Sequence, residues 1–140
     1  MARLIWLHDE CLSVPEWAQP NDQLVYIWDP VYLHHQAWSF KRWRFIYQCL
    51  CDLASSTSLS LHILEGSAPK ALELYSTQYQ AQLHLIQARD PILEAYLHQV
   101  CAQLDPALPC QWHAQPTWLS PPAVIPRGFF KFWKQVKSQI

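Results

Sequence analysis

Short apolar runs alternate with longer amphipathic stretches along this chain. The runs are rich in leucine, β-branched and aromatic residues, which is typical of strands buried in a sheet. They predict five strands, at Arg3–Leu7, Leu24–Trp28, Leu59–Leu64, Leu83–Ala88 and Cys110–His113.

The amphipathic stretches predict helices between these strands. From Trp38 to Ala54 the apolar residues recur with helical spacing, and a core-facing side is expected from Trp43, Ile46, Tyr47, Leu50, Leu53 and Ala54. A second helix follows Ser67 as N-cap, and a third begins at Asp90-Pro91. Strand and helix alternate as in βαβ units, so we expect an α/β fold with an open parallel sheet covered by helices on both faces.

The C-terminal part of the chain differs in character. Residues 116–126 are studded with proline and predict an extended connector. Residues 127–140 are basic and aromatic, and predict a helix or docking segment. We therefore expect one α/β domain over residues 1–126, followed by this segment.

Composition narrows the class of protein. Of the 140 residues, 51% are hydrophobic and 15% charged, which is enough for a packed core. The net charge of −1 supplies no general attraction to phosphate backbones, so no direct nucleic-acid binding is expected. An apolar N-terminal run ended by His8 is too short for a signal peptide, no stretch is long enough for a transmembrane segment, and the five cysteines are scattered. A cytoplasmic protein with reduced thiols is the expectation.

Familiar catalytic and metal motifs are not found in the sequence. It has neither a Gly-x-Gly-x-x-Gly nor a Walker lysine motif, and only two glycines. His34-His35 could join Cys49 and Cys51 around a metal, but neighbouring histidines diverge and Cys-x-Cys on a helix splays its thiols. The histidines are instead expected in a solvated loop. No catalytic residue, no metal and no enzymatic activity are predicted.

Several segments, taken together in their order, resemble a known family. They are Leu4–Leu7, Val25–Pro30, Arg44–Leu53, Leu64–Pro69 and Phe129–Trp133. Their order and spacing are similar to the N-terminal α/β domain of the photolyase/cryptochrome family. The resemblance implies a Rossmann-like five-stranded sheet in the order 3-2-1-4-5.

The departures from the family bear on function. The family has Arg-Arg-Asp-Leu-Arg after strand one, where this chain has residues 8–12, His-Asp-Glu-Cys-Leu. The Asn-Glu-Tyr segment that helps many members hold an antenna chromophore is replaced by residues 87–90, Gln-Ala-Arg-Asp. The helical domain that binds FAD and damaged DNA in the family is expected to be missing, so neither FAD nor photolyase activity is expected.

One crevice is a candidate ligand site. In an open α/β sheet, ligands bind beyond the carboxyl ends of the strands, where the strand order reverses. With the implied order, that point lies between strands one and four, and its lining residues would be His8, Asp9, Asp29, Gln87 and Arg89. They could hold a small polar ligand or an antenna chromophore. The favoured interpretation is that they cap helices and form surface ion pairs.

Surplus aromatic residues suggest a partner. The chain has eight tryptophans, of which those in strands and Trp43 are expected in the core. The candidate partner-binding residues are Trp118, Arg127, Phe129, Phe130, Phe132 and Trp133, which could fold back onto the domain or dock on another protein.

Three functions follow from these observations. The preferred hypothesis is a non-catalytic, photolyase-N-domain-like accessory subunit of a larger protein assembly, in a light-related or photosynthetic context. The alternative is a protein that binds an antenna chromophore, a flavin, folate or deazaflavin. The third is one half of a split photolyase or cryptochrome.

Overall fold

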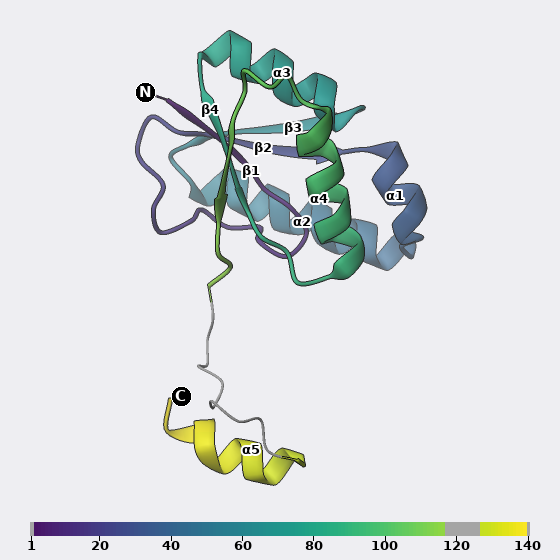
Figure 1. Ribbon diagram of the computed structural model, residues 1–140, viewed down its shortest axis with the longest axis vertical. Helices are drawn as coiled ribbons and strands as arrows, with labels where there is room; N and C mark the ends of the chain where they lie inside the picture. Colours follow the sequence, from purple (N-terminus) through teal and green to yellow (C-terminus); the bar gives the residue numbers. More distant parts are fainter. Residues whose placement is uncertain (1, 117–126, 140) are drawn as a thin grey trace.

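A five-stranded parallel sheet forms the centre of the molecule. The computed structural model describes residues 2–116 and 127–139. The strands lie in the order β3-β2-β1-β4-β5, and each pair of neighbours is parallel (Figure 1). Their bounds are β1 Arg3–Trp6, β2 Gln23–Trp28, β3 Ser60–Glu65, β4 Gln82–Ile86 and β5 Cys110–His113. The predicted fold class and strand order are confirmed.

Helices cover both faces of this sheet. Their bounds are α1 Pro30–Gln36, α2 Phe40–Ser56, α3 Ala68–Tyr79, α4 Pro91–Gln103 and α5 Phe129–Val136, which continues into the 3-10 turn η1 Lys137–Gln139. Buried residues of α1, α3 and α4 share one core cluster, and those of α2 belong to the other. In Figure 1, α5 lies apart from the sheet. Within the described ranges, no helix is long and apolar enough to cross a bilayer.

The strands alternate their side chains between the two core clusters. In β1, Leu4 and Trp6 face the α1, α3 and α4 side, whereas Ile5 faces α2. In β2, Val25 faces the α1, α3 and α4 side, whereas Tyr26 faces α2. Because both faces are covered, the central strands β1, β2 and β4 are nearly continuous apolar runs, and this is why the sequence predicted them well.

Carboxylate caps start two of the helices. Asp90 accepts a hydrogen bond from the backbone N–H of Ile92, and Pro91 occupies the first turn of α4, as predicted. Asp29 and Pro30 start α1 in the same way, with Asp29 accepting from the N–H of Val31. The expectation of a solvated loop around His34 and His35 was therefore wrong, because both lie on α1.

The predicted core face of α2 was too wide. Ile46, Leu50 and Leu53 are buried, as expected, but Trp43, Tyr47 and Ala54 are exposed. A helix that packs on a sheet through a single row of side chains buries only that row, and the positions beside it stay in solvent. The exposed aromatic side chains lie near the N-terminal half of α2, where it passes the carboxyl edge of the sheet.

Candidate functional site

The chain's own side chains bridge the strand ends at the predicted crevice. Nε2 of the buried His8 lies 2.8 Å from the carbonyl oxygen of Ile86, which joins the end of β1 to the end of β4. Glu10 accepts hydrogen bonds from the backbone N–H groups of Arg89 and Asp90, at 2.8 and 2.9 Å. These contacts occupy the point where the strand order reverses.

Glu10 was not among the predicted site residues. Burial opposes its ionisation, but the backbone N–H groups of Asp90 and Arg89 lower its pKa below the ordinary value, so it is ionised at neutral pH. A glutamate in a loop gives no sequence signal for such a long-range contact. Its role is to tie the loop after β1 to the start of α4.

Asp9 accepts hydrogen bonds from two tyrosine hydroxyls. The hydroxyl of Tyr26 donates to its Oδ1 over 2.9 Å, and the hydroxyl of Tyr32 donates to its Oδ2. Burial raises the pKa of Asp9 above the ordinary value, although both hydrogen bonds act in the opposite direction. Burial and the neighbouring carboxylate also raise the pKa of each tyrosine, so both hydroxyls keep their protons and act as donors.

Asp29 has a comparable set of partners on the other side of Tyr32. Its Oδ2 accepts from the hydroxyl of Tyr96 over 2.6 Å and from the N–H of Ala68 over 3.1 Å. The rings of Tyr32 and Tyr96 stack with centroids 4.6 Å apart. Asp29 therefore joins α1, α3 and α4 at the carboxyl edge of the sheet.

The last predicted crevice residue, Arg89, reaches a different part of the chain. Its guanidinium donates to the carbonyl oxygen of Pro116 over 3.2 Å. His8, Asp9, Asp29 and Arg89 all have hydrogen-bond partners within the protein. Of the four, Asp29 caps a helix as expected, but none forms an ion pair among the described residues, so the expected surface ion pairs are not seen there. The four do not converge on one cavity among the pockets described.

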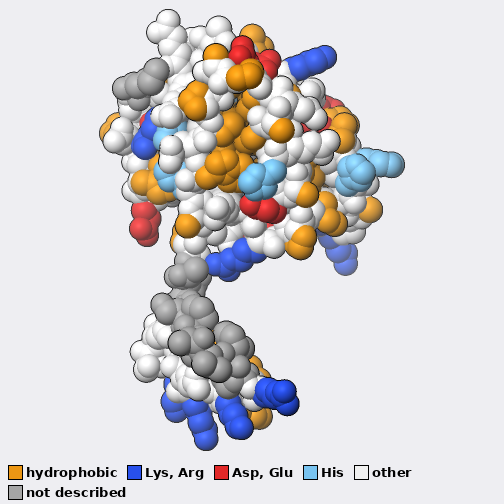
Figure 2. Space-filling model, in the orientation of Figure 1, with side chains coloured by type: hydrophobic (Ala, Val, Ile, Leu, Met, Phe, Trp, Pro, Cys, Tyr) orange, Lys and Arg blue, Asp and Glu red, His pale blue; other side chains and the backbone are white. Residues whose placement is uncertain are grey.

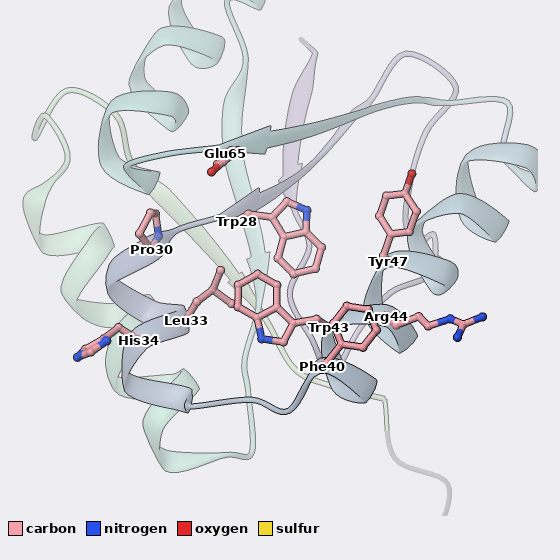
Figure 3. Close-up of a pocket in the computed structure, with 9 residues that line it drawn as sticks. All are labelled: Trp28, Pro30, Leu33, His34, Phe40, Trp43, Arg44, Tyr47 and Glu65. Carbon is pink, nitrogen blue, oxygen red and sulfur yellow. The ribbon is translucent and has the colours of Figure 1, made fainter.

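The largest described pocket lies one strand further along the same edge. Its volume is about 700 Å³, within the usual range for small-molecule sites. It opens at the ends of β2 and β3, where Trp28 and Glu65 are register partners. Its lining residues are Trp28, Pro30, Leu33, His34, Phe40, Trp43, Arg44, Tyr47 and Glu65 (Figure 3).

Four of the nine lining residues of this pocket, which we call the Trp28 pocket, are tryptophan, phenylalanine or tyrosine. The rings of Trp28 and Trp43 are parallel within 1°, with centroids 5.6 Å apart. Trp38 lies edge-on behind Trp43 at 6.5 Å. At the mouth, Phe40 is 80% exposed and Tyr47 56% exposed. Such a pocket suits a flat apolar group, which gains by stacking on exposed rings.

Polar groups of the Trp28 pocket are confined to its margins. Figure 3 shows the side chains of Arg44 and His34 directed away from the two indoles, with Glu65 on the opposite side from Phe40. A cation at the rim could attract an anionic group on whatever binds. No hydrogen bond links these three side chains into an acid–base pair within the part of the chain that the structure describes, and binding is the chemistry that the pocket supports.

Sequence reasoning missed this pocket because it assigned its residues elsewhere. Trp43 and Tyr47 were expected in the core, and His34 in a loop. The sequence did carry a signal for it, because α2 has more large aromatic residues than one buried row of a helix can hold. Only Asp29, next to Trp28 and Pro30 in sequence, was proposed near this position.

The predicted partner-binding residues fall into two groups. Trp118 lies outside the described residues. Phe129, Phe130 and Trp133 are exposed on α5 by 65%, 77% and 38%, Arg127 just before α5 is exposed, and Phe132 is half-buried. The ring contacts of Phe129 are with Phe130 and Trp133, at 5.7 and 6.2 Å, which makes a three-ring cluster on one side of the helix.

A histidine pair forms a further, partly buried polar cluster. Nδ1 of His84 lies 2.8 Å from Nε2 of His113, and the Trp17 ring stacks on His113 with centroids 3.8 Å apart. Arg3 lies over Trp17 and pairs with Asp22 at 2.6 Å. No group of three or more histidine, cysteine, aspartate or glutamate side chains with metal-site geometry occurs among residues 2–116 and 127–139.

Comparisons with known proteins gave no relative: no protein-family model matches the chain, and neither a curated protein nor a solved structure matches it significantly. The parallel sheet and its strand order are therefore known from this structure and not from a relative. Any function has to be argued from the surfaces described above.

Proposed function

We propose that this chain is a non-catalytic binding module, similar to the N-terminal α/β domain of the photolyase/cryptochrome family, that serves as an accessory subunit of a larger protein assembly. The strand order 3-2-1-4-5, which the resemblance implied, supports the proposal. Five free thiols agree with a reducing compartment such as the cytoplasm.

The exposed aromatic surface of α2 carries this proposal. Phe40, Trp43 and Tyr47 line the Trp28 pocket and are between 39% and 80% exposed. Phe45 is 54% exposed on another side of the same helix. Arg42 lies over the rings of Trp38 and Phe45 at 5.4 and 5.8 Å. Tryptophan, tyrosine and arginine are the residues that dominate protein–protein hot spots, and monomeric proteins rarely leave such a patch uncovered.

Affinity capture with a matched pair of variants tests the proposal. The chain is tagged and isolated at native levels, alongside the double substitution Phe40→Ala/Phe45→Ala, which removes two exposed rings without touching the core. The control, Leu74→Ala/Ile92→Ala, removes exposed apolar side chains from α3 and α4. We expect a partner that the wild type and the control retain and the α2 variant loses.

A monomer that captures nothing, or capture that the α2 variant leaves unchanged, would contradict the accessory-subunit proposal. The identity of a captured protein distinguishes the accessory subunit from the split-photolyase alternative. A helical flavoprotein partner would make this chain one half of a split photolyase or cryptochrome.

The Trp28 pocket also favours a second candidate, a protein that binds an antenna chromophore. Parallel indoles and a cationic rim fit a flat heterocycle with an anionic group, such as a flavin or deazaflavin. The natively purified protein would then absorb at longer wavelengths than tryptophan does. In a titration with flavin mononucleotide, Trp43→Ala should weaken binding about tenfold, by analogy with the loss of one base-stacking ring. A colourless protein that does not bind the flavin would remove this candidate.

A further inference from the structure

Charge is divided unequally along the chain. All eleven acidic residues precede residue 106, whereas the remaining 35 residues carry four cations and no acid. These cations are Arg127, Lys131, Lys134 and Lys137, all exposed on or next to α5. Figure 2 shows the blue side chains gathered along this helix. An acidic α/β domain is thus followed by a basic helix.

The basic helix is also strongly amphipathic. Phe129 and Trp133 share one helix face with the buried Val136, at i, i+4 and i+7, while Lys131 and Lys134 lie largely on the other. The exposed rings of Phe129, Phe130 and Trp133 form the three-ring cluster, and lysines border it. This arrangement, with Phe and Trp on one side and lysines on the other, is typical of helices that lie in a membrane interface.

We infer that α5 docks on an anionic lipid surface. The cations of α5 distinguish this occupant from a protein groove. Three of the four are lysines, which are depleted at protein–protein interfaces but frequent on membrane-surface helices, where long stems let the ammonium groups reach the headgroups. The α2 surface, with Arg42 and Arg44 among tryptophans and a tyrosine, has the opposite composition.

The unequal distribution of charge also sets the orientation of the molecule on the membrane. An anionic surface attracts the cations of α5, each by about fivefold in affinity, and repels the acidic domain. The rings of Phe129, Phe130 and Trp133 then enter the boundary between headgroups and acyl chains, while the domain stays in water with its α2 surface accessible. Docking of this kind goes beyond the accessory role and does not depend on it.

Co-sedimentation of the full chain with vesicles tests the inference. The vesicles are phosphatidylcholine alone or phosphatidylcholine mixed with phosphatidylglycerol. We expect binding to the mixed vesicles only, weakening as salt is raised because screening shortens the reach of the charges. Lys131→Gln/Lys134→Gln should weaken binding by about 25-fold, and Phe129→Ala/Phe130→Ala should abolish most of it.

Two controls keep the test specific to α5. Lys41→Gln/Lys70→Gln removes two exposed lysines elsewhere, and Phe40→Ala/Phe45→Ala removes two exposed rings from α2, so both should bind vesicles like the wild type. The α2 variant loses the proposed protein partner but keeps the lipid, and the α5 variants do the reverse, so the two proposals fail separately. No binding to the mixed vesicles, equal binding to neutral ones, or capture of a protein or nucleic acid through α5 without vesicle binding would overturn the inference.

Discussion

Tyr96 offers a direct test of the hydrogen-bond network at the carboxyl edge of the sheet. Its hydroxyl donates to Oδ2 of Asp29 over 2.6 Å, and its ring stacks on Tyr32 and lies edge-on to Trp6 at 6.1 Å. The substitution Tyr96→Phe removes only the hydroxyl and keeps both ring contacts. Any change in stability therefore reports the hydrogen bond.

The size of the effect follows from the partners that Asp29 keeps. A hydrogen bond to a charged group contributes about 1.5–3 kcal/mol. After the substitution, Asp29 still accepts from the N–H groups of Val31 and Ala68, so the carboxylate is not left without donors. We expect the free energy of unfolding to fall by about 2 kcal/mol, or about 7 °C in Tm for a domain of this size.

Protonation should not complicate this result. Burial, and next the hydrogen bond to Asp29, raise the pKa of Tyr96, so its hydroxyl carries a proton throughout the neutral range. The loss should therefore be the same at mildly acidic and mildly basic pH.

Urea unfolding followed by circular dichroism gives the measurement, with an unchanged m-value as the sign that both chains unfold by the same transition. Tyr79→Phe is the matched control, because Tyr79 is half-buried and contacts His62 and Tyr75 by its ring alone within the described residues. A Tyr96→Phe loss no larger than that of the control would refute the assigned role of the Asp29 network.

Three further outcomes test the core and the titrating groups. Leu85→Ala should cost about 2–5 kcal/mol because Leu85 is fully buried, whereas Leu74→Ala, 63% exposed, should change stability by less than about 0.5 kcal/mol; urea midpoints compare them. Burial lowers the pKa of His84 and His113 below the ordinary 6.5. As the pH falls, these histidines are therefore protonated in the unfolded chain before they are protonated in the folded one, and the free energy of unfolding should fall as the pH drops below 6.5. His84→Gln should flatten this dependence, and an unchanged slope would contradict it. Asp9 has the opposite sign: its raised pKa favours the folded state at low pH, so Asp9→Asn should gain stability relative to the wild type as the pH rises above 3.8 until the folded-state pKa is passed. A constant difference between these two chains across that range would show that Asp9 titrates normally.

The two proposals place association on different surfaces, one on α2 and one on α5. The first combines arginines with tryptophans and tyrosine beside a formed pocket, and the second combines lysines with phenylalanines on an amphipathic helix. Because they lie on separate elements, substitutions on one leave the other intact. This separation makes the two proposals independently testable.

Local signals in the sequence were enough to predict most of the elements. The apolar runs marked the central strands β1, β2 and β4, since a strand buried on both faces is apolar at nearly every position. The edge strands β3 and β5 are more exposed, and alternation or a short run flanked by prolines marked them instead. Asp90-Pro91 marked the start of α4 because a capping carboxylate and a first-turn proline act within a few residues. The same pair stands at Asp29-Pro30, but the short helix α1 that begins there was not predicted.

Tertiary structure decided which side chains meet. The sequence by itself determined strands, helix starts and their alternation, because these depend on contacts a few residues apart. It could not show that Glu10 would bridge the strand ends to Arg89, or that Trp43 would leave the core to stack on Trp28, because those contacts join segments brought together only by the sheet. The candidate site therefore moved from the predicted crevice, which the chain's own polar groups bridge, to an aromatic pocket at the ends of β2 and β3.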